Sequence, residues 1–192
     1  SLVTSKRGHL LSLAIARIRK HAPDMRTIGL SATVADPMDL QRYLSPQAEG
    51  EPTAGLITVD GGAKPDIAIL GTEERIPWSG HSARYAMQDL YPALKAHKTT
   101  LIFVNTRSQA ERIFQELWTI NDDNLPIALH HGSLDAGQRR KVEQAMADNK
   151  LRAVVATSTL DLGIDWGDVD LVVHVGAPKG ASRLAQRIGR AN

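Results

Sequence analysis

The chain has 192 residues, of which 42% are hydrophobic and 23% are charged, so its composition is that of an ordinary globular protein with one large domain or two small ones. It contains no cysteine, which excludes disulfides, thiolate zinc sites and iron–sulfur clusters. It has neither an apolar run of membrane-spanning length nor a signal-peptide pattern, so we expect a cytoplasmic protein, and its net charge of +2 does not by itself require nucleic acid.

The first part of the chain is predicted to hold two helices and three short strands. Apolar residues recur at helical spacing over residues 8–21, and Pro23 ends this helix. Asp36 and Pro37 form a good helix start, an N-cap acid followed by proline at the first helical position, and Ser45-Pro46 ends that helix. Short apolar runs predict strands at residues 27–30, 56–59 and 67–70.

The second part of the chain alternates strand and helix throughout. Its apolar runs predict strands at residues 100–104, 127–130, 153–157 and 171–175. Helices are expected at residues 107–118 and 135–148 and from residue 181 onward, and the first of them carries its apolar residues on one face: Ala110, Ile113, Phe114, Leu117 and Trp118. This alternation predicts an α/β fold with a mostly parallel sheet and helices on both faces.

Residues 156–165, Ala-Thr-Ser-Thr-Leu-Asp-Leu-Gly-Ile-Asp, follow a predicted buried strand. Small polar residues and Gly163 stand where a backbone must approach a ligand closely. Asp165 falls at the carboxyl end of the strand, where open α/β sheets bind ligands. The alternative interpretation is a turn glycine followed by a capping acid.

Residues 186–190, Gln-Arg-Ile-Gly-Arg, place Arg187 and Arg190 on nearly the same face of a helix. Two guanidinium groups that point the same way suit a phosphate, and residues 176–192 contain four basic residues and no acidic one. The alternative is a solvated helix face, which is the interpretation we favour for the basic residues of the first helix.

Two further turns carry polar residues after predicted strands. Asn105, Thr106 and Arg107 combine polar side chains with a helix start, an arrangement that binds anions, although an ordinary polar turn has the same appearance. Ser31 and Thr33 offer hydroxyls that can hydrogen-bond a neighbouring acid, or that simply form a Ser/Thr turn.

Two other patterns are less informative. His130 and His131 are adjacent on a strand and point to opposite faces, so they are expected to be structural, with Gly132 and Ser133 contacting a ligand through the turn. Residues 61–64, Gly-Gly-Ala-Lys, are not a phosphate loop, because Pro65 follows the lysine in place of the required Ser or Thr.

Together these motifs resemble those of superfamily 2 helicases, most closely the Lhr (large helicase-related) type of DExH helicase. Residues 5–8, 162–170 and 189–192 resemble in particular its bacterial ligase-associated branch. The resemblance implies RecA-like lobes: residues 1–74 would be the end of the first lobe with a linker, and residues 75–192 the second lobe, truncated in its last motif. The chain is then expected to be a piece of a longer protein, without the phosphate loop and acidic box that bind ATP.

The resemblance also assigns roles to residues. Ser31 and Thr33 would couple nucleotide state to movement. Gly163 and Asp165 would face the nucleotide, and Arg190 would act as an arginine finger, with Arg187 and Gln186 beside it; Arg187 would support that geometry or meet the acidic box. The groups expected to face nucleic acid are Asn105, Thr106, Arg107, Ser133, Thr157 and Ser158.

The function that the resemblance implies is that of an ATP-dependent DNA helicase or translocase in DNA repair, associated with the nucleoid. It would use ATP and Mg²⁺, held with the help of residues not in this chain, so the chain alone is expected to be inactive. Its expected partners are single-stranded DNA or a duplex with a 3′ tail, and the ligase-associated branch would add a DNA ligase and a nuclease encoded with it; no membrane is expected. The alternatives are an RNA helicase of a related branch and a non-catalytic RecA-like binding module.

Overall fold

The computed structural model describes residues 3, 5–31, 36–46, 53–59, 64–72, 78, 83–161, 168–178 and 180–189. The chain divides into two compact units, Ser1–Gly62 and Ala63–Asn192. The division falls within residues 48–80, which are rich in Gly, Pro, Glu and Thr, a composition that predicts a connection between lobes. The domain boundary after residue 74 stays a prediction.

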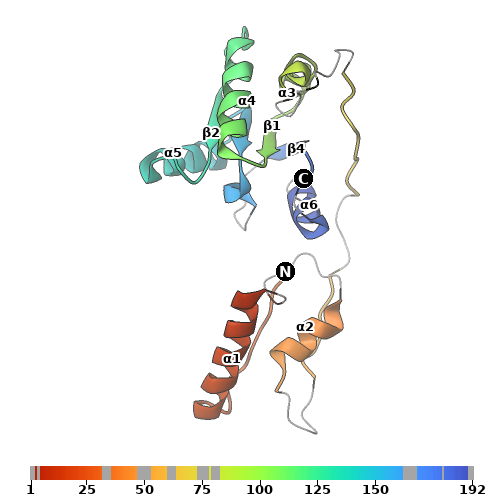
Figure 1. Cartoon of the computed structure of the whole chain (residues 1–192), viewed down its shortest axis with the longest axis vertical. Coiled ribbons are helices and arrows are strands. Elements are labelled where there is room, and N and C mark those ends of the chain that lie inside the picture. Colours follow the sequence, from red (N-terminus) through yellow and green to blue (C-terminus); the bar gives the residue numbers. More distant parts are fainter. Residues whose placement is uncertain are drawn as a thin grey trace. The chain divides into compact units, whose positions relative to one another are not determined.

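The first unit holds the two helices that the sequence predicts, α1 (Lys6–His21) and α2 (Pro37–Leu44) (Figure 1). The side chain of Ser5 caps α1 by accepting a hydrogen bond from the Gly8 amide at 3.2 Å. Asp36 caps α2 by accepting from the Met38 amide at 2.9 Å, with Pro37 at the first helical position as expected.

Polar contacts join the elements of this unit. The Tyr43 hydroxyl on α2 donates to the Gly8 carbonyl on α1 at 2.7 Å. Arg19 on α1 donates to the Thr27 hydroxyl at 2.8 Å and also to the Leu44 carbonyl. These bonds hold α1, α2 and the segment between them together with little buried apolar surface.

The three strands predicted for the first part of the chain do not form. Residues 27–30, 56–59 and 67–70 are all described, and none of them is in a strand. Their apolar side chains are exposed, Leu30 and Ile69 to 96% each. A strand needs a neighbour for its backbone N–H and C=O groups, and none of these segments is paired within the described part of the chain.

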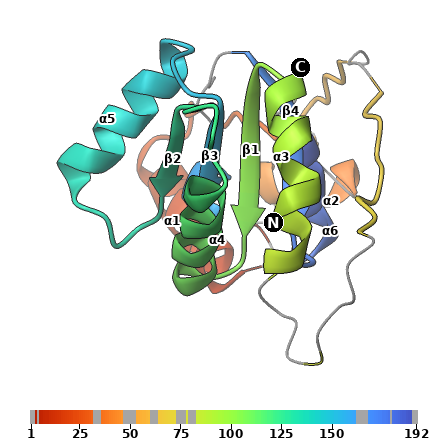
Figure 2. The same cartoon turned by 90° about the horizontal axis from the view of Figure 1, so that it is seen from above.

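The second unit contains a four-stranded sheet in the order β2-β3-β1-β4 (Figure 2). The strands are β1 (Thr99–Val104), β2 (Ile127–His130), β3 (Ala153–Ala156) and β4 (Val169–Val175). Every pairing is parallel, which confirms the predicted sheet. The strands lie within a few residues of their predicted positions.

Helices cover both faces of this sheet, as expected. On one face, α3 (Met87–Ala96) and α4 (Arg107–Thr119) pack on the side chains of Ile102 and Val104. On the other face, α5 (Ala136–Ala147) packs beside Leu101 and Phe103, and the end of α6 (Ala181–Ile188) lies over the Phe103 ring. Alternate residues of β1 thus enter two separate cores.

Two details differ from the sequence prediction. Helix α3 was not among the predicted elements. Pro92 lies inside it and removes a helical hydrogen bond, and the buried side chains of Leu90 and Leu94 stabilise the helix nonetheless. Trp118, expected on the apolar face of α4, is 59% exposed and stacks on Phe114, with 5.8 Å between ring centroids.

Candidate nucleic-acid and nucleotide site

The carboxyl ends of the four strands form the candidate site. Because the strands are parallel, the turns that follow them meet at one edge of the sheet. These turns are residues 105–107 after β1, 131–133 after β2, 157–161 after β3 and 176–178 after β4. The edge therefore brings together the groups that the sequence predicts to face nucleic acid.

Two of those groups are in direct contact. Arg107 opens α4, where the Thr106 hydroxyl accepts from the Gln109 amide at 3.2 Å and caps the helix. The Arg107 Nη1 donates to the Ser133 hydroxyl at 2.7 Å, and both residues are exposed. An exposed guanidinium and hydroxyl at a capped helix start are suited to bind a phosphate.

Asn105 has a different position. Its side-chain Nδ2 donates to the Ala177 carbonyl at 3.0 Å, which joins the turn after β1 to the turn after β4. The neighbouring Gly176 has φ +84°, and a Cβ there would lie 3.2 Å from that same Nδ2. Glycine is required at this turn by both its backbone conformation and the close approach of Asn105.

His130 links three elements beneath this edge. Its Nδ1 lies 2.8 Å from the Thr159 hydroxyl in the short 3-10 turn η2 (Ser158–Leu160), and its Nε2 lies 3.1 Å from Glu143 on α5. The ring is 1% exposed, and burial lowers the pKa of His130, an effect that Glu143 opposes. The neutral ring thus ties the turn after β3 to β2.

His131 has other partners. Its Nδ1 accepts from the Ser133 amide at 3.3 Å, and its Nε2 lies 3.4 Å from Glu111 on α4. The two histidines therefore contact different residues, in keeping with the structural roles expected of them. Across the described residues, no group of three His, Cys, Asp or Glu side chains could hold a metal ion.

Arg187 is enclosed within the second unit. Its side chain is 2% exposed, and its Nε donates to Asp161 Oδ1 at 2.7 Å. Its guanidinium carbon lies 4.3 Å from the centroid of the Phe103 ring. This is an arrangement suited to a residue that supports the geometry of α6, and a catalytic role for Arg187 stays a prediction.

Asp161, which is buried, and His174, which is half-buried, lie around Arg187 and Phe103, and neither was predicted from the sequence. Asp161 also pairs with Arg183, whose Nε lies 3.1 Å from Oδ2. The sequence did contain a sign that Asp161 has a specific role, because it is the one charged residue between Ala153 and Gly163. His174 stacks beside Phe103 at 5.7 Å, and burial, followed by the charge of Arg187, lowers the pKa of His174. No local sequence pattern indicates the stacking of His174 on Phe103, because the two residues lie on different strands.

The remaining predicted site residues are placed only in part. Gln186 is half-buried on α6, Thr157 is half-buried and Ser158 is exposed after β3. Ser31 is exposed in the first unit. Thr33, Gly163, Asp165 and Arg190 lie outside the described residues, so their roles stay predictions.

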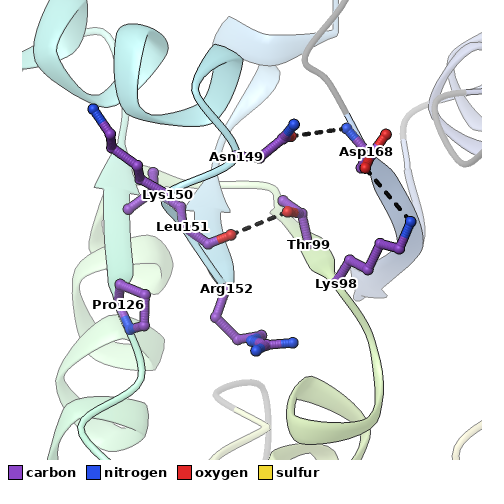
Figure 3. Close-up of a pocket in the computed structure, with 8 residues that line it drawn as sticks. All are labelled: Lys98, Thr99, Pro126, Asn149, Lys150, Leu151, Arg152 and Asp168. Atoms are coloured by element: carbon purple, nitrogen blue, oxygen red, sulfur yellow. Dashed lines mark hydrogen bonds and ion pairs between the residues drawn. The ribbon is translucent and has the colours of Figure 1, made fainter.

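A pocket of about 280 Å³ lies at the opposite edge of the sheet, at the amino ends of the strands (Figure 3). Its polar groups bind one another: Lys98 lies 3.5 Å from Asp168, and the Asp168 amide donates to Asn149 Oδ1 at 3.1 Å. The Thr99 hydroxyl donates to the Leu151 carbonyl at 3.0 Å. These contacts close the sheet edge, and none of the predicted site residues lines the pocket.

Comparison with known proteins places this geometry in a family context. The model of the family described as "Helicase conserved C-terminal domain" matches residues 84–192. The chain is 37% identical to the ATP-dependent helicase Lhr-Core protein 2 of Thermococcus barophilus, over 100% of the chain and 23% of the relative. It is 31% identical to the Lhr helicase/uracil glycosylase of Escherichia coli, over 97% of the chain and 15% of the relative. The chain thus spans less than a quarter of the length of these curated relatives.

Solved structures of helicases are also similar to this chain. The structure of the Mycobacterium smegmatis helicase Lhr bound to ssDNA and AMP-PNP has a TM-score of 0.75 and 34% identity, covering 99% of this chain and 25% of that one. Saccharomyces cerevisiae Dbp5 bound to RNA and ADP BeF3 has a TM-score of 0.67 at 19% identity, a likeness of fold alone, covering 99% of this chain and 47% of that one. The RecA-like α/β fold expected for the second lobe is therefore confirmed. In the described part of the chain, no helix is long and apolar enough to cross a membrane.

Proposed function

Since the chain belongs to the helicase conserved C-terminal domain family and is of the Lhr type, we propose that it forms one wall of the motor of an ATP-dependent DNA helicase or translocase. Residues 75–192 would be the second RecA-like lobe, and residues 1–74 the end of the first lobe with the linker. The longer protein would act in DNA repair.

The observation that carries this proposal is the contact between Arg107 and Ser133 at the carboxyl edge of the sheet. These residues come from turns after two different strands, and both are exposed beside a capped helix start. Thr157 and Ser158 follow the strand that lies between those two strands in the sheet. We propose that this edge grips successive phosphates of a single strand, as positioning contacts that do not read sequence.

ATP and Mg²⁺ are the proposed cofactors. The M. smegmatis helicase Lhr, whose solved structure is bound to ssDNA and AMP-PNP, is similar to 99% of this chain. From this chain, Gly163, Asp165 and Arg190 would face the nucleotide, while the phosphate loop and the acids that hold Mg²⁺ would be supplied by residues not in this chain. Bound Mg²⁺ would neutralise charge on the phosphates, and Arg190 would stabilise the charge that develops on the γ-phosphate.

Ser31 and Thr33 would connect the lobes to this chemistry. In our proposal their hydroxyls bind the acidic box, so that closure around ATP moves the second lobe along the DNA. Replacing both with alanine in the complete protein should therefore weaken unwinding more than ATP hydrolysis. Equal losses would instead indicate an ordinary structural turn.

The proposal is tested by measuring ATP hydrolysis by the complete protein with and without single-stranded DNA, and unwinding of a duplex with a 3′ tail. Arg107→Ala should weaken DNA binding and flatten its salt dependence by roughly 0.7 in log–log slope, the value for one lost phosphate contact. Arg112→Ala, which removes an exposed arginine from the same helix, is the matched control.

The rival functions give different results in this assay. Hydrolysis stimulated by RNA and not by DNA would identify an RNA helicase of a related branch. Absence of hydrolysis would indicate a non-catalytic RecA-like module. The isolated chain should turn over no ATP, because it would hold only one wall of the nucleotide cleft.

The finer assignment, to the ligase-associated branch, rests on residues 5–8, 162–170 and 189–192. It would add a DNA ligase and a nuclease as partners. Co-purification of either enzyme with the complete protein, from cells in which all three are expressed at native levels, would support it. The assignment would be contradicted if the gene for this protein lay apart from any ligase gene and if the two proteins did not co-purify.

A further inference from the structure

A charged contact, rather than an apolar one, anchors α6 to the sheet. Among the described side chains of this helix, Arg187 alone is buried. Leu184, its one leucine, is 36% exposed. A surface helix is ordinarily held by a stripe of apolar side chains, so this helix depends to an unusual degree on the environment of a single guanidinium.

Two groups contact the Arg187 guanidinium, one at its edge and one at its face. Asp161 accepts from Nε at 2.7 Å, and the Phe103 ring lies beneath the guanidinium at 4.3 Å. The ring is in turn stacked beside His174, its register partner on β4. A planar cation held between a carboxylate and an aromatic face has little freedom to rotate, so the helix that carries it is fixed in rotation and depth.

Asp161 belongs to the turn that follows β3. Its amide donates to the Ser158 carbonyl at 3.2 Å and closes η2, the turn that begins directly after Thr157. Two residues earlier, the Thr159 hydroxyl is 2.8 Å from His130 of β2. One short turn is therefore bonded on one side to the strand that leads to Ser133 and on the other side to α6.

We propose that Asp161 is a positioning residue that acts through Arg187 and sets the direction in which the chain leaves α6 toward Arg190, three residues later. This inference rests on the proposed function, because Arg190 matters as a finger only in an ATP-hydrolysing protein. Arg183, which is 41% exposed at its side chain, adds a second and weaker contact with the same carboxylate.

The first test measures how stably α6 is held against the sheet. In the complete protein, Asp161→Asn should speed backbone amide exchange in residues 183–189 by roughly tenfold or more, while exchange in α4 and β1 stays unchanged. The matched control is Glu116→Gln, which breaks an ion pair with Arg84 on the opposite face of the sheet. Unchanged exchange in α6 would overturn the proposal.

The second test separates positioning from binding. Asp161→Asn should lower kcat for DNA-stimulated ATP hydrolysis by roughly 100-fold, the cost of a small misplacement of a catalytic group, with the KM for ATP within about threefold of the parent. Arg183→Ala, which leaves the bond between Asp161 and Arg187 in place, should change kcat by less than about threefold. An equal effect of both variants, or a loss confined to KM, would overturn the assignment.

A double variant keeps the test valid if a single variant is unstable. Asp161→Ala combined with Arg187→Met removes both charges, so its loss of kcat should not exceed that of the worse single variant. Losses that multiply would show that the two residues act independently and would overturn the proposal. If the parent protein hydrolyses no ATP, the proposed function fails, whereas amide exchange in α6 still decides whether Asp161 positions the helix.

Discussion

Two short segments of similar composition adopt different structures. Residues 27–30, Thr-Ile-Gly-Leu, form no strand in the first unit and are exposed after the half-buried Thr27, whereas residues 100–104, Thr-Leu-Ile-Phe-Val, form most of a buried strand in the second. The second segment has β3 on one side and β4 on the other. The difference shows that an apolar run is only a candidate strand, and that neighbouring strands decide its structure.

The two units also differ in how they are stabilised. The second unit has two apolar clusters, one on each face of its sheet. In the described part of the first unit, only Gly8 and Ser45 are buried, and polar bonds such as that of Arg19 with Thr27 join its elements. A Cβ added at Gly29 would lie 2.7 Å from the Leu44 side chain, but neither residue belongs to a buried apolar cluster of the described residues. Apolar burial stabilises strongly, while exposed polar contacts add little.

The largest expected effect concerns a residue of the second unit, Arg190. In the complete protein, Arg190→Ala should lower kcat for DNA-stimulated ATP hydrolysis by roughly 10³-fold, because an arginine finger acts on charge that develops in the transition state. Binding of ATP, measured by equilibrium titration, should change little. Hydrolysis within about tenfold of the parent would remove Arg190 from this role.

A matched pair of isoleucines tests the contrast in burial. Ile102→Ala should lower the free energy of unfolding by about 2–5 kcal/mol, because the side chain is fully buried and its removal leaves a cavity. Ile28→Ala, at a position that is 83% exposed, should change it by less than about 0.5 kcal/mol. Urea unfolding of the chain measures both, and equal losses would show that residues 27–30 are packed in solution.

A smaller effect on stability is expected from substitutions at Asn149, just after the C-terminal end of α5. Asn149 has φ +54°, and the amides of Asn149 and Lys150 donate to the carbonyls of Met146 and Ala145, each at 2.9 Å. Asn149→Ala should cost about 1–2 kcal/mol, because alanine tolerates this left-handed conformation poorly. Asn149→Gly should be nearly neutral, since it relieves the backbone while losing the bond to Asp168. Thermal unfolding of the two variants compares them directly.

The smallest effect expected is a loss of stability in mild acid. Burial lowers the pKa of both His130 and His174 below the ordinary value of 6.5. As pH falls through 6.5 toward the lower folded values, the unfolded state takes up protons first, so the free energy of unfolding decreases; above 6.5 both states are neutral and the effect is absent.

Thermal melting of the 192-residue chain at pH 7.5 and 5.5 measures this effect. His174→Phe, which keeps a ring beside Phe103, should reduce the difference in Tm between the two pH values. The same two-pH comparison on His21→Gln, an exposed residue of α1, is the control. An unchanged difference in the His174 variant would show that other groups cause the acid sensitivity.

Local patterns in the sequence were enough to predict most elements of the second unit and the edge of the sheet at which the predicted site lies. Apolar runs predicted its four strands, an apolar face predicted α4, a helix-start signal predicted α5, and a further helix was expected from residue 181; the alternation of strands and helices predicted a parallel sheet. Parallel strands end at one edge, so Arg107 and Ser133 could be expected on the same edge without knowledge of the strand order. The cap at Asp36 was predicted in the same way, because a cap involves residues only two or three positions apart.

Which of these elements contact one another could not be predicted from local patterns and is seen only in the folded chain. The order β2-β3-β1-β4, the bond between Arg107 and Ser133 and the burial of Arg187 against Asp161 all join residues at least 26 positions apart. The same is true of the strands predicted at residues 27–30, 56–59 and 67–70, whose residues have suitable side chains but no strand partners in the described part of the chain. Periodicity reports which face of an element is apolar, whereas contacts between distant residues depend on how the whole chain closes its sheet and fills its cores.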